Sequence, residues 1–67
     1  MNIDIAEYPQ LSLIAWHLSK DATINGKEAL ALYERNWRFV EETALERQEQ
    51  ELINLLKDRY GGGFLHV

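Results

Sequence analysis

The sequence predicts a small, mainly α-helical domain of three helices, the last two forming an antiparallel hairpin. Apolar residues recur at helical spacing in three stretches, and residues typical of helix ends flank each stretch. We expect helices over about residues 8–19, 26–39 and 44–60, followed by a glycine hinge at 61–63 and an apolar tail at 64–67. With 67 residues, the chain is expected to be one domain.

The first expected helix, residues 8–19, is apolar on two sides. Pro9 suits a first helical turn. One side carries Tyr8, Leu11, Ile14, Ala15 and Leu18, and the opposite flank carries Leu13 and Trp16. A surface helix of a small monomer normally has a single apolar stripe. We therefore expect either that the other helices wrap around this one, or that its second side contacts another chain.

The second expected helix, residues 26–39, has a lone amide on its apolar face. Asn25 and Glu28 have the spacing of a capping box at its start. When residues 29–40 are wound at about 100° per residue, Asn36 falls near the middle of the apolar arc. An unpaired buried amide costs about 1–3 kcal/mol. Asn36 is therefore expected to have a hydrogen-bond partner.

The third expected helix, residues 44–60, supplies a candidate for that partner. Thr43 and Glu46 suggest a capping box, and Gly61 suits a left-handed helix end. Glu49 falls within the apolar face. Because a short turn joins the last two helices, we expect either a buried hydrogen bond between Asn36 and Glu49 or a bond from the amide to a backbone carbonyl, which would fix helix register or pairing. A ligand contact and exposure at the rim are the alternatives.

Both ends of the chain contain short apolar segments. Ile3 and Ile5 alternate with polar residues, as in a small strand. Residues 20–24 are expected to be a connection. The tail carries Phe64, Leu65 and Val67, which we expect to be buried: paired with residues 3–5, packed under the first helix, or inserted into a partner chain. A minor pairing of the two terminal segments is part of the predicted fold.

Catalytic, metal and cofactor sites are not expected. The chain has no cysteine, and His17 and His66 lack the short spacing of metal ligands. Gly61 to Gly63 follow a helix rather than precede one, which is the wrong end for phosphate. Ser12 and Ser19 lack the context of a nucleophile elbow. We therefore expect a protein that is not an enzyme.

The charge distribution limits the expected partners. The net charge is −4, and residues 41–51 contain five glutamates against one arginine. Such a stretch stabilises a helix start or docks to a basic partner. The last two helices suggest a helix-turn-helix with Arg35 and Arg38 facing phosphate, but glutamates at the start of the recognition helix would repel DNA. Nucleic-acid binding through Arg35 and Arg38 is thus the weaker expectation.

These observations predict a small, soluble, cytoplasmic interaction module that forms a homodimer. Chains this short usually need disulfides, a metal or oligomerisation for stability, and no cysteine is present. No leader or membrane-spanning apolar run is evident. The candidate contact residues are Leu13, Trp16, Trp37, Phe64, Leu65 and Val67. The alternative is a nucleic-acid-associated regulator, for instance the acidic partner of a basic toxin or DNA-binding protein.

Overall fold

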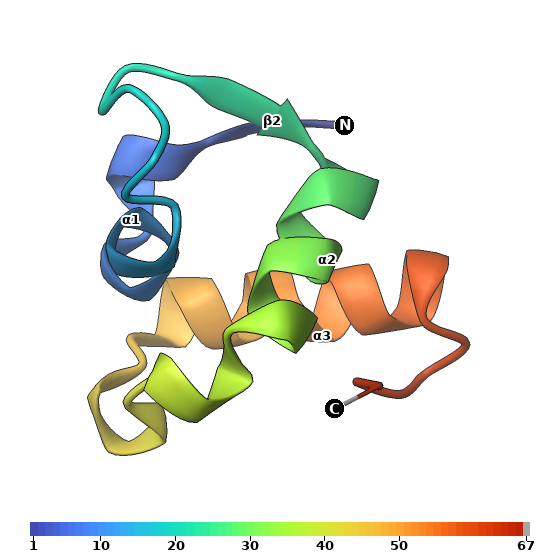
Figure 1. Cartoon of the computed structure of the whole chain (residues 1–67). Coiled ribbons are helices and arrows are strands. Elements are labelled where there is room, and N and C mark those ends of the chain that lie inside the picture. Colours follow the sequence, from blue (N-terminus) through green and yellow to red (C-terminus); the bar gives the residue numbers. More distant parts are fainter. Residues whose placement is uncertain (67) are drawn as a thin grey trace.

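The computed structural model, which describes residues 1–66, contains three helices and a two-stranded sheet (Figure 1). Short 3-10 turns link several of the elements. In chain order they are β1 (Asn2–Asp4), a 3-10 turn (Ile5–Glu7), α1 (Pro9–Ile14), β2 (Thr23–Asn25), α2 (Gly26–Arg35), two 3-10 turns (Trp37–Phe39 and Glu42–Ala44) and α3 (Arg47–Tyr60). The predicted three-helix class is confirmed.

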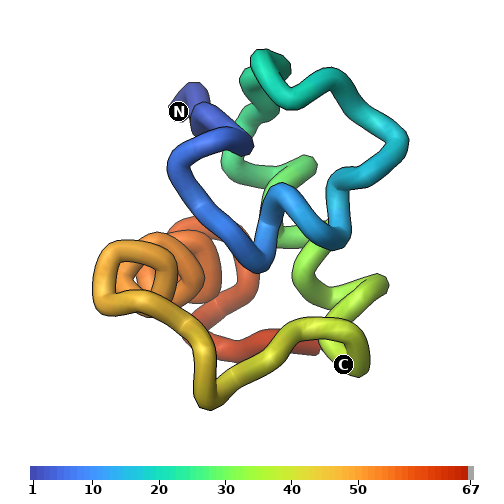
Figure 2. Tube along the Cα trace, turned by 90° about the vertical axis from the view of Figure 1, so that its left-hand side faces the viewer, coloured from blue at the N-terminus to red at the C-terminus, as the bar shows by residue number. Residues whose placement is uncertain are grey.

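Helices α2 and α3 form the predicted antiparallel hairpin. Gly26, at the start of α2, lies so close to the Tyr60 ring at the end of α3 that an added Cβ would touch that ring. Further along α2, Tyr33 is hydrogen-bonded to Glu49 in the first turns of α3. In Figure 2, α3 is seen nearly end-on, with the N-terminal third of the chain above it and the α2–α3 connection below.

The small sheet pairs the N-terminal segment with a segment that we expected to be a connection. Strands β1 and β2 are antiparallel, with Ile3 opposite Ile24. Both isoleucines are buried, while the residues on either side of them are exposed. Strand β1 therefore takes residues 23–25 as its partner, rather than the C-terminal tail. Strand β2 has one apolar residue, Ile24, between two polar ones, which is too little to show an alternating pattern in the sequence.

Helix α1 is shorter than the predicted 8–19. It ends at Ile14, and Ala15 caps it through an N–H donated to the Leu11 carbonyl. A tight turn follows, in which Leu18 donates to the Ala15 carbonyl. The chain turns here because β2 must return to lie beside β1. Trp16 and His17 consequently lie in a turn, not on the helix.

Helix α2 also ends early, at Arg35 rather than residue 39. Asn36 is its C-cap, and the Asn36 side chain donates to the Leu32 carbonyl, with 3.0 Å between nitrogen and oxygen. A 3-10 turn, Trp37–Phe39, follows. The expected cap at the start of α2 is present, since Asn25 accepts from the Glu28 N–H at 2.8 Å. Asn36 thus marks the end of the helix.

Helix α3 begins later than predicted, at Arg47. The expected capping box is wrong, because the Thr43 hydroxyl donates to the Glu41 side chain and Glu46 is an N-cap without a side-chain bond. The helix ends at Tyr60 as expected. Gly61 has a φ of −108°, and the left-handed conformation falls instead on Gly62 and Gly63, with φ of 63° and 88°.

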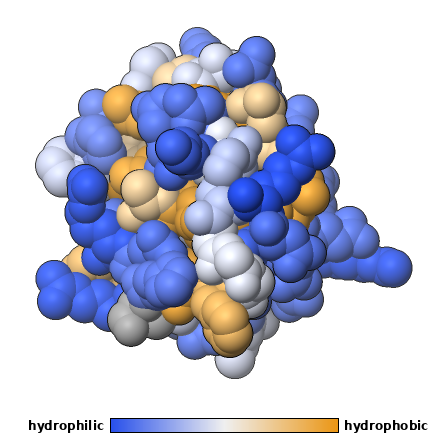
Figure 3. Space-filling model, turned by 90° about the vertical axis from the view of Figure 1, so that its right-hand side faces the viewer, coloured by the Kyte–Doolittle hydropathy of each residue, from blue (hydrophilic) through white to orange (hydrophobic). Residues whose placement is uncertain are grey.

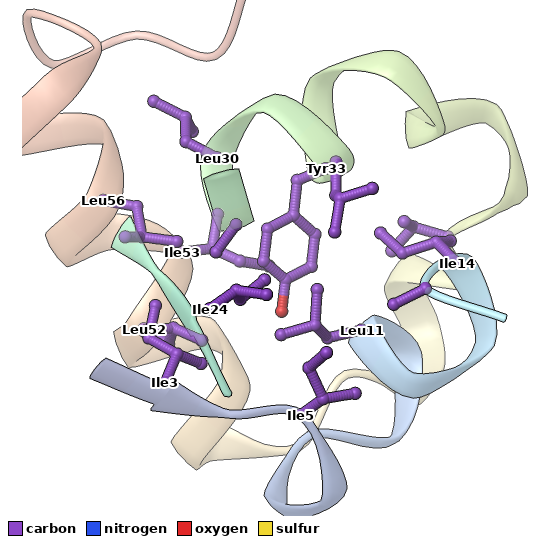
Figure 4. Packing of buried hydrophobic residues seen from close by; sticks show 14 residues of the cluster. Ile3, Ile5, Leu11, Ile14, Ile24, Leu30, Tyr33, Leu52, Ile53 and Leu56 are labelled. Atoms are coloured by element: carbon purple, nitrogen blue, oxygen red, sulfur yellow. The ribbon is translucent and has the colours of Figure 1, made fainter. Parts of the chain in front are cut away.

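One hydrophobic core joins the three helices and both strands. Tyr33 lies near its centre, with its hydroxyl directed toward Leu11 and Ile5 (Figure 4). The core consists of Ile3, Ile5, Leu11, Ile14, Ala15, Ile24, Ala29, Leu30, Leu32, Tyr33, Val40, Leu52, Ile53 and Leu56. Leu65 of the tail packs against it, and the His66 N–H donates to Glu34 at 2.9 Å. Leu65 and His66 therefore contact their own chain, whereas the expected burial of Phe64 is wrong, because its side chain is exposed.

Candidate interaction surface and buried carboxylate

The most buried charged group is the carboxylate of Glu49, only 1% exposed. It accepts three hydrogen bonds: from the backbone N–H of Gln10 at 3.1 Å, from that of Leu11 at 2.9 Å, and from the Tyr33 hydroxyl at 2.6 Å. The first N–H groups of any helix have no partner inside the helix. Glu49 supplies that partner for α1 from a distance of nearly forty residues along the chain.

Tyr33 donates the short side-chain bond in this arrangement. Its ring is fully buried, and burial raises the pKa of its hydroxyl well above the usual value of 10. The hydrogen bond to the Glu49 carboxylate raises the pKa further, because ionised Tyr33 would place two negative charges in contact. Tyr33 therefore remains protonated, and a hydrogen-bond donor, at neutral pH.

Gln10 extends the network to the connection between α2 and α3. This side chain is also buried, and its amide oxygen accepts from the Glu41 N–H at 3.0 Å. Within residues 1–66, every buried side-chain nitrogen and oxygen has a hydrogen-bond partner. The start of α1 is thus attached to α2, to α3 and to the segment between them.

This network is structural, and its partners differ from those predicted. Glu49 is buried as expected. Of the two partners expected for Asn36, the structure shows a backbone carbonyl, and the contact with Glu49 is wrong. Asn36 is half-buried and bonded to Leu32 of its own helix. The residue of α2 that meets Glu49 is Tyr33, three positions earlier. Neither Glu49 nor Tyr33 lines the surface hollows described below, so a substrate has no access to them there.

Three strongly exposed apolar side chains line one hollow, between the C-terminal end of α1 and the segment that follows α2. Trp16 is 80% exposed, Leu13 66% and Phe39 61%. We call these three residues the Trp16 face. The indole of Trp16 also meets the His17 ring edge-on, with 5.7 Å between ring centroids. Figure 3 shows the face that lies to the right in Figure 1. On this face polar residues separate the apolar ones.

Two hollows flank the ridge formed by Leu13 and Trp16. One, of about 290 Å³, is lined by Leu13, Ile14, Trp16, Asn36 and Phe39. The other, of about 440 Å³, lies on the side of Ser12 and Ser19 and reaches Lys20. The exposed Trp16 ring therefore protrudes between two recesses.

The other predicted contact residues are either partly buried or lie outside the Trp16 face. Trp37 and Leu65 are half-buried and pack against the core. Phe64 is 69% exposed but stands on the tail, away from the residues that line the two hollows. Val67 lies outside the described residues. Of the predicted surface, Leu13 and Trp16 therefore lie together, and the structure adds Phe39 to them.

The candidate cationic residues, Arg35 and Arg38, are both exposed and have different neighbours. Arg38 lies over the Phe39 ring, 4.8 Å from its centroid. Arg35 lines a separate hollow of about 230 Å³ that also contains Glu28. Glu41, Glu42 and Glu46, which lead into α3, are exposed. The charges that argued against a DNA-binding recognition helix therefore lie at the surface, except for that of Glu49.

Within the described part of the chain, no three potential ligands gather into a metal site. The His66 ring is within hydrogen-bond distance of the tail turn, with its Nε2 3.2 Å from the Gly61 carbonyl oxygen. Among residues 1–66, no helix has both the length and the apolar character needed to span a bilayer.

Sequence reasoning missed two residues, Tyr33 and Phe39. Both lie on the apolar arc that residues 29–40 form when they are wound as one continuous helix. Asn36 was the signal that could have separated them, because asparagine side chains bond readily to nearby backbone groups and so favour helix ends over helix interiors. A helix that ends at Arg35 keeps Tyr33 in the core and releases Phe39 to the surface.

The fold and the surface define a small helical domain with a buried carboxylate and one exposed aromatic face. Comparisons with models of protein families, with curated proteins and with solved structures gave no match to this chain. Its function is therefore inferred from its own geometry.

Replacing Glu49 with Gln should destabilise the protein strongly. The amide keeps the size of the carboxylate, but it removes the charge and, because the two backbone donors bond different oxygens, it turns an NH2 group toward one of them. We expect a loss of about 2–4 kcal/mol in the free energy of unfolding, measured by urea denaturation. A Glu49→Gln protein that is unfolded even without urea would also agree with this prediction.

Glu51→Gln is the matched control. Glu51 is exposed and forms a 3.7 Å ion pair with Arg47, so its loss should change stability by less than about 0.5 kcal/mol. Equal, small effects at the two positions would show that Glu49 does not hold α1 in place.

The stability of the fold should fall at alkaline pH through Tyr33. Because the pKa of Tyr33 is raised in the folded protein, its contribution to the free energy of unfolding is fully present below pH 10. The contribution is lost as the pH rises and Tyr33 ionises in the unfolded chain. Above pH 10, wild type should lose about 1.4 kcal/mol per pH unit relative to Tyr33→Phe. Urea denaturation of both proteins at several pH values measures this. A constant difference between them would contradict the assignment.

Proposed function

We propose that the protein is a non-catalytic interaction module that self-associates through the Trp16 face. The observation that carries the proposal is the exposure of Trp16, at 80%, beside two further exposed apolar side chains, Leu13 and Phe39. Single exposed apolar residues are common, but contiguous exposed apolar groups mark interaction sites. Tryptophan is also enriched at the centres of protein interfaces.

The size of the chain supports the same proposal. With 67 residues and no cysteine, the chain has a limited core and no disulfide to support it. Association of two copies would bury apolar surface that the monomer leaves in water. The C-terminal tail contributes less than the sequence suggested, because Leu65 already packs on the core of its own chain.

Docking to a basic partner is the second candidate. Glu41, Glu42 and Glu46 are exposed and close in sequence, while Glu49 is withdrawn into the core. Contacts between exposed charges weaken with salt, because the screening length is about 8 Å at physiological ionic strength. Association through the Trp16 face should instead persist at high salt.

Replacing Trp16 with Ala should weaken self-association at least tenfold. The indole is the largest exposed apolar group, and interface tryptophans commonly account for 2 kcal/mol or more of binding energy. Sedimentation equilibrium over a range of concentrations, at low and high salt, measures the change against the 7.8 kDa monomer mass.

Phe64→Ala is the control, because Phe64 is a similarly exposed aromatic residue outside the Trp16 face. It should associate as wild type does. A strictly monomeric wild-type protein at millimolar concentration would overturn the proposal. Loss of association in Phe64→Ala but not in Trp16→Ala would move the contact to the tail.

A further inference from the structure

The Trp16 face carries a protruding group and a hollow side by side. Trp16 stands out from the surface, and its own ring forms one wall of the hollow of about 290 Å³. In a twofold dimer the same patch on each copy makes the contact, so it must be complementary to itself. A protrusion next to a recess of similar chemistry meets this condition: one rotation places each ring in the other copy's hollow.

The polar groups of the two features also match. Asn36 is the polar residue that lines this otherwise apolar hollow. Its amide nitrogen donates to the Leu32 carbonyl, and no hydrogen bond within residues 1–66 uses its amide oxygen. An indole has one N–H donor and no acceptor, and it usually finds a partner when buried. A residue that lines the hollow therefore has an acceptor free of bonds within residues 1–66, and the protruding ring carries one donor.

Charge does not oppose this contact at close range. The residues that line the hollow are uncharged, and Arg38 lies at its edge, over the Phe39 ring. Most of the excess negative charge lies in residues 41–51, which do not line this hollow, and charges are screened beyond about 8 Å at physiological ionic strength. The hollow thus suits an uncharged aromatic group rather than a charged side chain.

We propose that a second copy of this chain covers the Trp16 face. The Trp16 ring of each copy is seated in the other copy's hollow, and its indole N–H donates to Asn36 Oδ1. This inference rests on the proposed self-association and specifies its geometry. It also gives Asn36 a second role: the amide that ends α2 provides the hydrogen bond that orients the dimer.

The available area sets the strength of such a dimer. Aromatic side chains bury about 150–250 Å² each, whereas a stable interface buries about 800 Å² per partner. The three side chains of the Trp16 face supply roughly half of that area. We therefore expect a weak dimer that is half-formed between about 10 µM and 1 mM protein.

The native protein provides the first test, by NMR between about 20 µM and 2 mM. The indole Nε1 proton of Trp16 should move downfield with concentration as it becomes hydrogen-bonded. The indole proton of Trp37, which packs against the core, is the internal control and should stay in place.

A double-mutant cycle provides the second test. Trp16→Phe keeps an aromatic ring but lacks the donor, so it should weaken association about tenfold. Asn36→Ala should have an effect of similar size, and adding it to Trp16→Phe should cost little more, because the bond is already lost. Thermal melts check that Asn36→Ala is folded; the indole shift of the native protein requires no variant.

The outcomes separate this inference from the function on which it rests. If the protein associates but the Trp16 indole proton does not move and Trp16→Phe behaves as wild type, the geometry is overturned and self-association stands. If the protein stays monomeric at the highest concentration, both are overturned.

Discussion

The carboxylate of Glu49 is the group on which the arrangement of this fold depends. A buried charge without partners is too costly to keep, so its three hydrogen bonds are requirements of the structure. Two come from the backbone of α1 and one from Tyr33 of α2, while Glu49 itself belongs to α3. A single side chain therefore fixes the relative positions of all three helices, which apolar packing alone would leave freer to slide.

The position of the exposed aromatic face follows from this attachment. Helix α1 has six residues, fewer than an isolated helix needs to persist in water. Its start is held by Glu49 and its first turn packs Leu11 into the core. The turn that follows carries Trp16, while Phe39 follows α2. The buried network thus aligns the two segments that together form the Trp16 face.

Periodicity was enough to predict the three helices, the hairpin and the burial of Glu49. It could not predict where the helices end, because residues 36–39 continue the apolar arc of α2 although the backbone has already left the helix. Nor could it identify the partner of Glu49, since backbone N–H groups have no signature in the sequence. Of the predicted contact surface, Leu13 and Trp16 are exposed together, whereas Trp37 and Leu65 were assigned to it from their apolar character and pack on the core.

Native-state amide hydrogen exchange tests the role of Glu49 most directly, because it reports on the two backbone donors themselves. If the carboxylate holds α1, the N–H groups of Gln10 and Leu11 should exchange only on global unfolding, as slowly as the N–H of Leu56 within α3. Fast exchange of Gln10 and Leu11 while Leu56 remains protected would show that α1 opens independently, and would contradict a fold organised around this carboxylate.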